Sequence, residues 1–328
     1  MGNPVALGAL LTPGLRAEFA RVYSESYLEE GADVDAIVAT VPSDKIKEIF
    51  GYPESAPYPV RWDRGNLIGS KSFKSIQNTI INRNWGRRIY IHSDDVGDEQ
   101  TGQAWNQVRE LGRNWGSLRS RIFSQYIQNA TDNDLLPTVP NSADGSALYI
   151  STTRFGVSGG NIVTQSGSTT VQQLINDLFD VKRRYIDFQN TETQPLLDPG
   201  IIQNKGLHIF YGSSMNQLFE QGLKAAVVAI GANTTTSNAG VSNLVMATGY
   251  PITVTATQRI TNTAFYTFIK GLPTEKRPLT RLVREGFSEA QGNWETSDHT
   301  RDTGELYVQF RSREGWGSMV PYATVKVV

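Results

Sequence analysis

The chain has 328 residues, of which 39% are hydrophobic and 19% are charged, so it can bury a large core and is not a disordered tail. The 31 Lys and Arg residues nearly balance the 32 Asp and Glu residues, and a net charge of −1 gives the whole chain no general attraction to nucleic acid or to an anionic membrane. There is no cysteine and there are 3 histidines, which excludes disulfides, thiolate zinc sites and iron–sulfur clusters and leaves few positions for metal or general-base chemistry.

The N-terminal region predicts a helix over residues 12–29. A threonine followed by a proline suits its start, because a proline in the first turn loses no hydrogen bond. Leu15 and Phe19 begin an apolar stripe at helical spacing, and Gly31 is expected to end the helix. The region has no long apolar run, so we expect neither a signal peptide nor a membrane span.

Residues 38–91 predict a long β-hairpin. Prolines are dense in its first half and exclude a long helix. Residues 45–52 and 73–81 are β-prone, residues 88–91 form a further short strand, and a polar turn at 63–66 lies between the arms. Because such a hairpin buries little apolar surface by itself, we expect it to lie on a neighbour.

Residues 100–129 predict a single helix, about 45 Å long at the standard rise. Its apolar face comprises Trp105, Val108, Leu111, Trp115, Leu118, Ile122 and Tyr126. Four acidic residues between positions 94 and 99 precede it, where the helix dipole favours them; a cation site is the alternative, but the spacing is not that of a calcium loop. The arginines at 109, 113, 119 and 121 are expected to pair with carboxylates of a neighbouring element or subunit rather than with nucleic acid.

The rest of the chain predicts a second amphipathic helix and several strands. The helix begins after a cap at Ser168 or Thr169, and its buried face comprises Val171, Leu174, Ile175, Leu178, Val181, Tyr185 and Phe188. Ser213 caps a short helix that reaches residue 223. Strands are expected at 147–150, 207–211, 252–256, 265–269, 279–284, 305–311 and 323–328. Together the elements predict an α+β fold with helices packed on mixed sheets.

No motif indicates catalysis. The run His92-Ser93-Asp94 is explained by helix capping, since adjacent residues rarely form a catalytic triad. His208 lies in an apolar strand and is expected to be a hydrogen-bonded core residue, while His299 is expected to be solvated. The glycine-rich residues 156–160 lack the lysine and hydroxyl of a phosphate-binding loop. We therefore expect no enzyme activity, no cofactor and no metal site.

Several segments, in their order along the chain, carry a family resemblance. They are LRAEF at 15–19, VPS at 41–43, FGY at 50–52, RWDRGNL at 61–67, IINRNW at 80–85, IHSDDV at 91–96, DGSALY at 144–149, RPLT at 277–280 and VQFRSREGWG at 308–317. This series resembles the major head (capsid) subunit of Mu-like tailed bacteriophages, which has the Hong Kong 97-type capsid fold.

The resemblance implies an N-arm at 1–37, an E-loop with flanking strands at 38–92, a peripheral (P) domain with a spine helix at 93–168, a mainly axial (A) domain at 169–270, and strands returning to the P domain at 271–328. It implies a structural protein that self-assembles into hexamers and pentamers of an icosahedral head. The implied partners are further copies of the chain, portal, scaffolding and decoration proteins, and double-stranded DNA held non-specifically, with no membrane. The implied location is the virion capsid, assembled in the cytoplasm of the host bacterium.

The E-loop would reach over an adjacent subunit, and aromatic or arginine side chains are typical anchors of such contacts. Its candidate interface residues are Phe50, Tyr52, Tyr58, Arg61, Trp62, Arg64, Lys71 and Phe73. Leu15 and Phe19 are the candidate contacts of the N-arm. Trp105, Arg109, Arg113 and Trp115 are those of the spine helix. Three alternatives remain open: an encapsulin-like compartment of the same fold, a soluble hydrolase that uses His92 or His208, and a tail or baseplate component.

Overall fold

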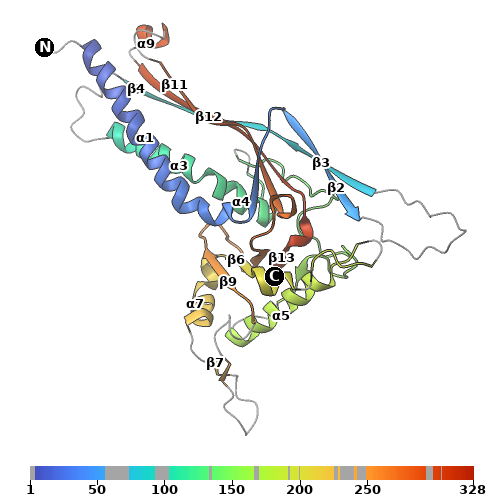
Figure 1. Ribbon diagram of the computed structural model, residues 1–328. Coiled ribbons are helices and arrows are strands. Elements are labelled where there is room, and N and C mark those ends of the chain that lie inside the picture. Colours follow the sequence, from blue (N-terminus) through green and yellow to red (C-terminus); the bar gives the residue numbers. More distant parts are fainter. Residues whose placement is uncertain are drawn as a thin grey trace, which may run out of the picture.

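The computed structural model is an α+β chain built on two larger sheets and a projecting hairpin (Figure 1). It describes residues 4–55, 74–92, 103–132, 135–165, 170–190, 193–198, 200–224, 228–229, 240–241, 249–292, 298–303 and 305–328. The helices are α1 (Pro4–Asp35), α3 (Gln103–Gly116), α4 (Leu118–Gln128), α5 (Val171–Asp187), α6 (Ile201–Lys205), α7 (Asn216–Lys224) and α9 (Asp298–Thr303). None of the helices in these ranges is both long and apolar enough to cross a bilayer.

The strands are β1 (Val38–Pro42), β2 (Lys47–Ser55), β3 (Lys74–Ile81), β4 (Arg83–His92), β5 (Ile162–Val163), β6 (Leu207–Tyr211), β7 (Val228–Ala229), β8 (Gly240–Val241), β9 (Ile252–Ala256), β10 (Phe265–Ile269), β11 (Leu279–Gly292), β12 (Glu305–Ser318) and β13 (Thr324–Val327). Short 3₁₀ turns are η1 (Ser213–Met215), η2 (Thr274–Lys276) and η3 (Pro321–Ala323). The α+β class predicted from the sequence is therefore confirmed.

A four-stranded sheet, ordered β1-β11-β12-β4, carries α1 and α3 on one face (Figure 1). Aromatic rings hold the helices there. Phe19 of α1 stacks on Phe310 of β12, with 3.7 Å between the ring centroids, and on Phe287 of β11, with 5.3 Å. Trp115 of α3 meets Phe287 edge-on at 5.9 Å. This stack fixes the helix pair against the sheet.

The N-terminal helix is longer than the sequence predicts, because it runs from Pro4 to Asp35 and does not end at Gly31. A Cβ on Gly31 would overlap the guanidinium of Arg119 in α4. The glycine therefore admits a side chain of another helix and does not act as a stop signal. Pro13 lies inside this helix and not in its first turn.

The predicted 30-residue helix is divided into α3 and α4 at Ser117. Hydrogen bonds continue across the division, since the Ser117 N–H donates to the Arg113 carbonyl (2.9 Å) and the Arg121 N–H donates to the Ser117 carbonyl (3.0 Å). α1 passes close to the helices at this division. A Cβ on Gly116 would come within 2.6 Å of the Ser26 Cβ. The apolar period alone could not reveal this contact.

A five-stranded sheet, ordered β5-β13-β10-β6-β9, is buried on both faces. In β10, Phe265 and Ile269 join the cluster beneath α5, whereas Tyr266 and Phe268 join the cluster beneath α4. The Tyr185 hydroxyl of α5 donates to the Thr267 carbonyl over 2.9 Å. Burial on both faces explains why β6 and β10 are apolar in the sequence except for His208 and Thr267.

Three strands, β6, β9 and β10, have the predicted bounds, whereas the predicted bounds of four other elements were wrong. β11 and β12 each extend to 14 residues, because they pair along their lengths through two bulges. The last strand, β13, is shorter than predicted. The N-cap of α5 is Thr170, one or two residues later than predicted, and it forms a capping box with Gln173.

Residues 147–150 do not form the predicted strand, because side chains take up their backbone groups. The Leu148 carbonyl accepts hydrogen bonds from Arg154 Nη1 and Asn161 Nδ2, both at 2.7 Å. The Ile150 N–H donates to Asn161 Oδ1 at 3.1 Å. This side-chain network replaces the ladder of a neighbouring strand.

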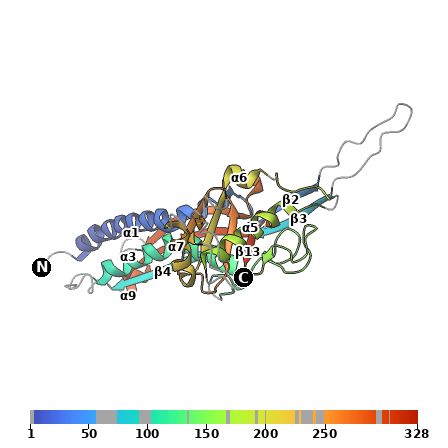
Figure 2. The ribbon, with the colours of Figure 1, turned by 90° about the horizontal axis from the view of Figure 1, so that it is seen from below.

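The predicted hairpin is confirmed as the antiparallel pair of β2 and β3, with Lys47 opposite Ile81 and Ser55 opposite Lys74. Residues 88–91 belong to β4, which joins the four-stranded sheet beside β12. The predicted turn at 63–66 lies outside the described residues. Figure 2 shows α1 and the hairpin at opposite ends of a flat, elongated molecule.

Candidate assembly interface

The hairpin has one face on the body of the molecule and one face toward solvent. Ile80 is 2% exposed and lies in the main core, with Phe50 half-buried beside it. On the opposite face, the register places Ile49 beside Thr79 and Lys47 beside Ile81. Ile49 is 59% exposed and Ile81 is 55% exposed. Large apolar side chains gathered on one exposed face are typical of a contact surface.

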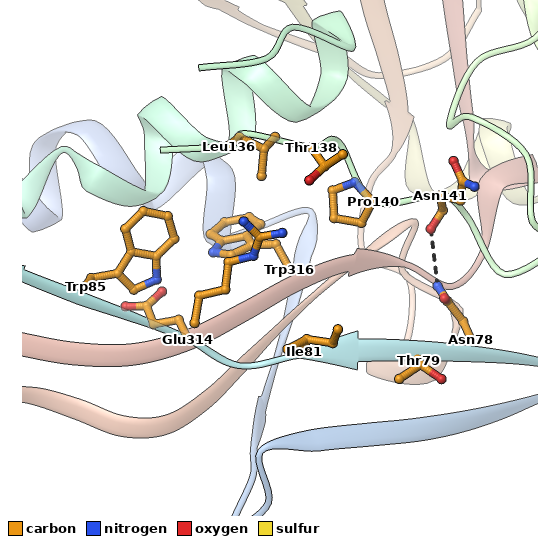
Figure 3. Close-up of a pocket in the computed structure, with 11 residues that line it drawn as sticks. Asn78, Thr79, Ile81, Trp85, Leu136, Thr138, Pro140, Asn141, Glu314 and Trp316 are labelled. Atoms are coloured by element: carbon orange, nitrogen blue, oxygen red, sulfur yellow. Dashed lines mark hydrogen bonds between the residues drawn. The ribbon is translucent and has the colours of Figure 1, made fainter. Parts of the chain in front are cut away.

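A pocket of about 310 Å³ lies at the base of this hairpin (Figure 3). It is lined by Asn78, Thr79, Ile81, Arg83, Trp85, Leu136, Thr138, Pro140, Asn141, Glu314 and Trp316. Asn78 Nδ2 closes one end by donating to the carbonyls of Asn141 (3.5 Å) and Ser318 (2.9 Å). The indole N–H groups of Trp85 and Trp316 are buried and have no acceptor among the described residues. The pocket therefore combines the apolar surface of Leu136, Pro140 and the two tryptophans with polar side chains, among them Arg83.

The carboxylate at the pocket wall is neutralised within the chain. Arg281 Nε and Nη2 donate to the two oxygens of Glu314 at 2.7 and 2.8 Å, and Nη1 donates to the Tyr27 hydroxyl at 3.3 Å. Both charged side chains are nearly buried. The pair ties the sheet to α1, and it leaves the pocket without a free negative charge.

Two of the four arginines, Arg109 of α3 and Arg119 of α4, bind carboxylates of a neighbouring element, as the sequence predicts. Arg109 Nε donates to Glu18 Oε1 of α1 at 2.6 Å. Hydrogen bonds from Arg21, and then from Arg109, lower the pKa of the Glu18 carboxyl to about 2. Arg119 pairs with Asp35, and its guanidinium lies 3.3 Å from the ring centre of Tyr27. These pairs lie within one chain and stabilise the packing of α1.

His208 is a hydrogen-bonded core residue, as predicted. It is 1% exposed, and its Nε2 lies 2.8 Å from the Thr255 hydroxyl, which donates to Asp33 Oδ2 of α1 over 2.6 Å. Burial lowers the pKa of His208 to about 4. A substrate cannot reach this side chain, so it offers a hydrolase no general base.

The other candidate residues for catalysis or metal binding lie at the edge of the described residues or outside them. His92 lies at the end of β4, and Ser93, Asp94 and the acidic run that follows lie outside the described residues. The side chain of His299 also lies outside them. Within the described parts of the chain, no group of three His, Asp or Glu side chains is placed to hold a metal ion.

The candidate interface residues have different positions in the structure. Phe19 is fully buried in its own chain, because its ring stacks on Phe310 beneath α1. Its assignment as an N-arm contact is therefore corrected. Phe50 and Trp115 are half-buried against their own chain, and Arg109 and Arg113 are exposed on α3. The side chains of Leu15, Tyr52 and Trp105 lie outside the described part of the molecule, as do Tyr58, Arg61, Trp62, Arg64, Lys71 and Phe73 altogether.

Sequence reasoning missed Ile49, Ile81, Trp85 and Trp316 as candidate contact residues. The run Thr79-Ile80-Ile81 gave the available signal, because consecutive β-branched residues place apolar groups on both faces of a strand. Only one of those faces can pack on the body, so the other is left for a partner. That Trp85 and Trp316 line one pocket could not be predicted, because the pocket depends on β12 returning beside β4.

Comparison with a protein-family model matches residues 13–134 to the Mu-like prophage major head subunit gpT. No curated protein matches the sequence. Among solved structures, the capsid of a native GTA particle has a TM-score of 0.55 at 10% identity and covers 92% of this chain and 90% of its own. A structure from Microbacterium phage Oxtober96 has a TM-score of 0.52 at 12% identity and covers 90% of both chains. The capsid of the cyanophage P-SCSP1u has a TM-score of 0.52 at 11% identity, covering 89% of this chain and 85% of its own.

These structural likenesses show the fold, and the expected Hong Kong 97-type capsid fold is confirmed. The family match covers α1, the hairpin and the helices α3 and α4, where most of the resemblance was recognised in the sequence. Neither the family match nor these three likenesses favour a compartment shell, a hydrolase or a tail component.

Proposed function

We propose that this chain, a phage capsid protein by fold and a Mu-like major head subunit by its match over residues 13–134, assembles with copies of itself into hexamers and pentamers of a closed icosahedral head. The family match carries the proposal, and it includes the hairpin, where Ile49 and Ile81 leave apolar surface uncovered. The exposed face of the hairpin supports the proposal, since Ile49 and Ile81 are not covered by any described side chain of the same chain.

The same interpretation assigns parts of the chain to the shell. Helix α1 would be the N-arm, β2 and β3 the E-loop, and α3 with α4 the spine of the P domain, beside the four-stranded sheet. The five-stranded sheet with α5 would form the A domain around the symmetry axes. The strand β13 would belong to this A domain, because it pairs with β10.

The subunit would act as a structural protein without a reaction of its own. Portal, scaffolding and decoration proteins would be its further partners, and packaged double-stranded DNA would be held non-specifically. Assembly would take place in the cytoplasm of the host bacterium. An encapsulin-like compartment would differ in its contents, so nuclease-resistant DNA in purified particles favours the phage head.

The test removes the end of the hairpin without disturbing the core. Deleting all of residues 41–85 would also remove buried Ile80 and the start of β4, so a smaller change is needed. Replacing residues 56–73 by Asn-Gly joins Ser55 to Lys74 through a favoured two-residue turn. We expect the wild type to form closed shells in electron micrographs. The shortened chain should keep its circular dichroism spectrum and form none.

A matched pair of variants separates the hairpin face from general surface hydrophobicity. Ile49→Ser with Ile81→Ser should prevent or strongly weaken assembly. Leu28→Ser, at a position of α1 that is 65% exposed, should leave assembly intact. Shells of normal size from the shortened chain, or equal effects of the two surface changes, would contradict the proposed role of the hairpin.

A further inference from the structure

We propose that the pocket at the base of the hairpin binds a small organic acid, with its carboxylate at Arg83 and its apolar body against Leu136, Pro140 and the two tryptophans. The inference goes beyond the proposed function, because the residues that line the pocket all belong to one chain. The observations behind it are an arginine without a partner, walls of mixed chemistry, and a shape that hydrogen bonds hold in place.

The charge of the pocket favours an anion. Two of the described side chains that line it are charged, Arg83 and Glu314. Arg281 binds both carboxylate oxygens of Glu314, so this negative charge is compensated within the chain. Arg83 is half-buried on β4, and its side chain has no ion pair or hydrogen bond with a described residue.

One uncompensated guanidinium suits a carboxylate better than a phosphate group. Arginine binds a carboxylate through two parallel hydrogen bonds, and the two charges cancel. A phosphate monoester carries more negative charge than a single arginine balances, and the nearby carboxylate of Glu314 would add repulsion. The ligand is therefore expected to carry one negative charge.

The rest of the pocket suits an apolar body next to that charge. Figure 3 shows Leu136 and Pro140 on one side of the pocket and Ile81 on the opposite side. Trp316 is 5% exposed, and neither its indole N–H nor that of Trp85 has an acceptor among the described residues. A carboxylate offers about four acceptor positions, enough for a guanidinium and an indole N–H together.

Hydrogen bonds within the chain hold the walls of the pocket. The Tyr126 hydroxyl donates to the Pro140 carbonyl over 3.0 Å, and the N–H and carbonyl of Leu136 both bond to the backbone of Asp132 at 2.9 Å. The volume of about 310 Å³ lies at the lower end of the range of small-molecule sites, about 300–1,000 Å³. A site with fixed walls loses little conformational freedom when a small ligand binds.

The test compares phenylacetate with phenylacetamide, which have nearly the same shape and differ in charge. Equilibrium dialysis measures the binding of each to the purified full-length protein, as unassembled subunits and as shells. We expect the acid to bind about tenfold more tightly than the amide, because charge-assisted hydrogen bonds are roughly twice as strong as neutral ones. Arg83→Gln should remove this difference. Arg87→Gln should preserve it, since Arg87 is exposed on the same strand and is not among the residues that line the pocket.

A second variant locates the site without changing a charge. Thr138 is exposed and lines the pocket, so Thr138→Trp should fill part of the space and weaken binding of the acid severalfold. Equal binding of acid and amide by the wild type would overturn the inference and leave the proposed function standing. The same holds if Arg83→Gln keeps the difference, or if Thr138→Trp binds the acid as the wild type does. Binding to subunits but not to shells would also overturn it, since a neighbouring polypeptide would then fill the pocket.

Discussion

The buried pair of Arg281 and Glu314 gives a sharp prediction about stability. Glu314→Gln keeps the shape of the side chain but removes its charge, while arginine stays charged at all accessible pH values. Both side chains are about one-tenth exposed, so the remaining guanidinium is held out of water without a counter-charge. Breaking one partner of a buried pair costs about 3–5 kcal/mol.

This cost can be converted into a melting temperature. A chain of 328 residues has an unfolding entropy of roughly 0.7 kcal/mol/K at about 2.1 cal/mol/K per residue, so the variant should melt about 4–7 °C below the wild type. The measurement is differential scanning calorimetry of the unassembled subunit. Replacing both partners, by Arg281→Met with Glu314→Leu, should recover most of the loss because no buried charge remains.

An exposed pair in the same chain is the matched control. Arg183 and Asp187 are 3.6 Å apart on α5, with side chains 80% and 48% exposed. Asp187→Asn should cost less than about 0.5 kcal/mol, because water screens such pairs. A melting temperature of Glu314→Gln no lower than that of Asp187→Asn, or a double replacement as unstable as Glu314→Gln alone, would show that the buried charge carries no such cost.

Three further predictions concern the packing of α1, the core histidine and a helix cap. Gly116→Ala should destabilise the subunit by up to about 2 kcal/mol, since crowding costs about 1–3 kcal/mol and the gain in helix propensity returns about 1 kcal/mol, whereas Gly286→Ala, with open space around it, should not. Chemical denaturation compares the two variants, and equal midpoints would contradict the close crossing. Because burial lowers the pKa of His208 to about 4, the unfolded chain binds a proton at this residue more readily than the folded chain does. The contribution of His208 to folding stability should therefore be fully present above pH 6.5 and should fall by roughly 3 kcal/mol toward pH 4. The same pH dependence of stability in a His208→Asn variant would contradict this assignment. Thr170→Ala should lose the capping box of α5 and about 0.5–2 kcal/mol, and an unchanged urea midpoint would show that the cap contributes nothing.

The sequence was most informative where one local pattern decides the structure. The amphipathic period of α5 predicts its buried face, and Leu174, Leu178 and Val181 are fully buried. Strands β6 and β10 were found with their bounds because runs of five residues that are apolar except for His208 and Thr267 suit a sheet covered on both faces.

Sequence reasoning failed where a residue's role depends on a distant partner. Gly31 was expected to end a helix, but the guanidinium of Arg119 occupies the space that a side chain would need. The division at Ser117 lies beside the crossing of α1, which no period within residues 100–129 contains. Residues 147–150 form no strand because Arg154 and Asn161 bind their backbone groups.

The candidate interface shows the same limit. Aromatic residues were favoured as anchors, but Phe19 is enclosed by Phe287 and Phe310 of its own chain. The exposed apolar residues of the described chain include Ile49 and Ile81 instead, and their outward direction follows from the register of the hairpin. A sequence gives the composition of a strand, but only the fold determines which face remains uncovered.

The most direct test of self-assembly is the mass of the purified full-length protein in solution, measured by sedimentation and cryo-electron microscopy. Closed shells of uniform diameter, with the hairpin of each subunit lying against its neighbour, are the predicted result. A stable monomer of 36.3 kDa at every protein concentration, with Ile49 and Ile81 still open to solvent, would contradict it.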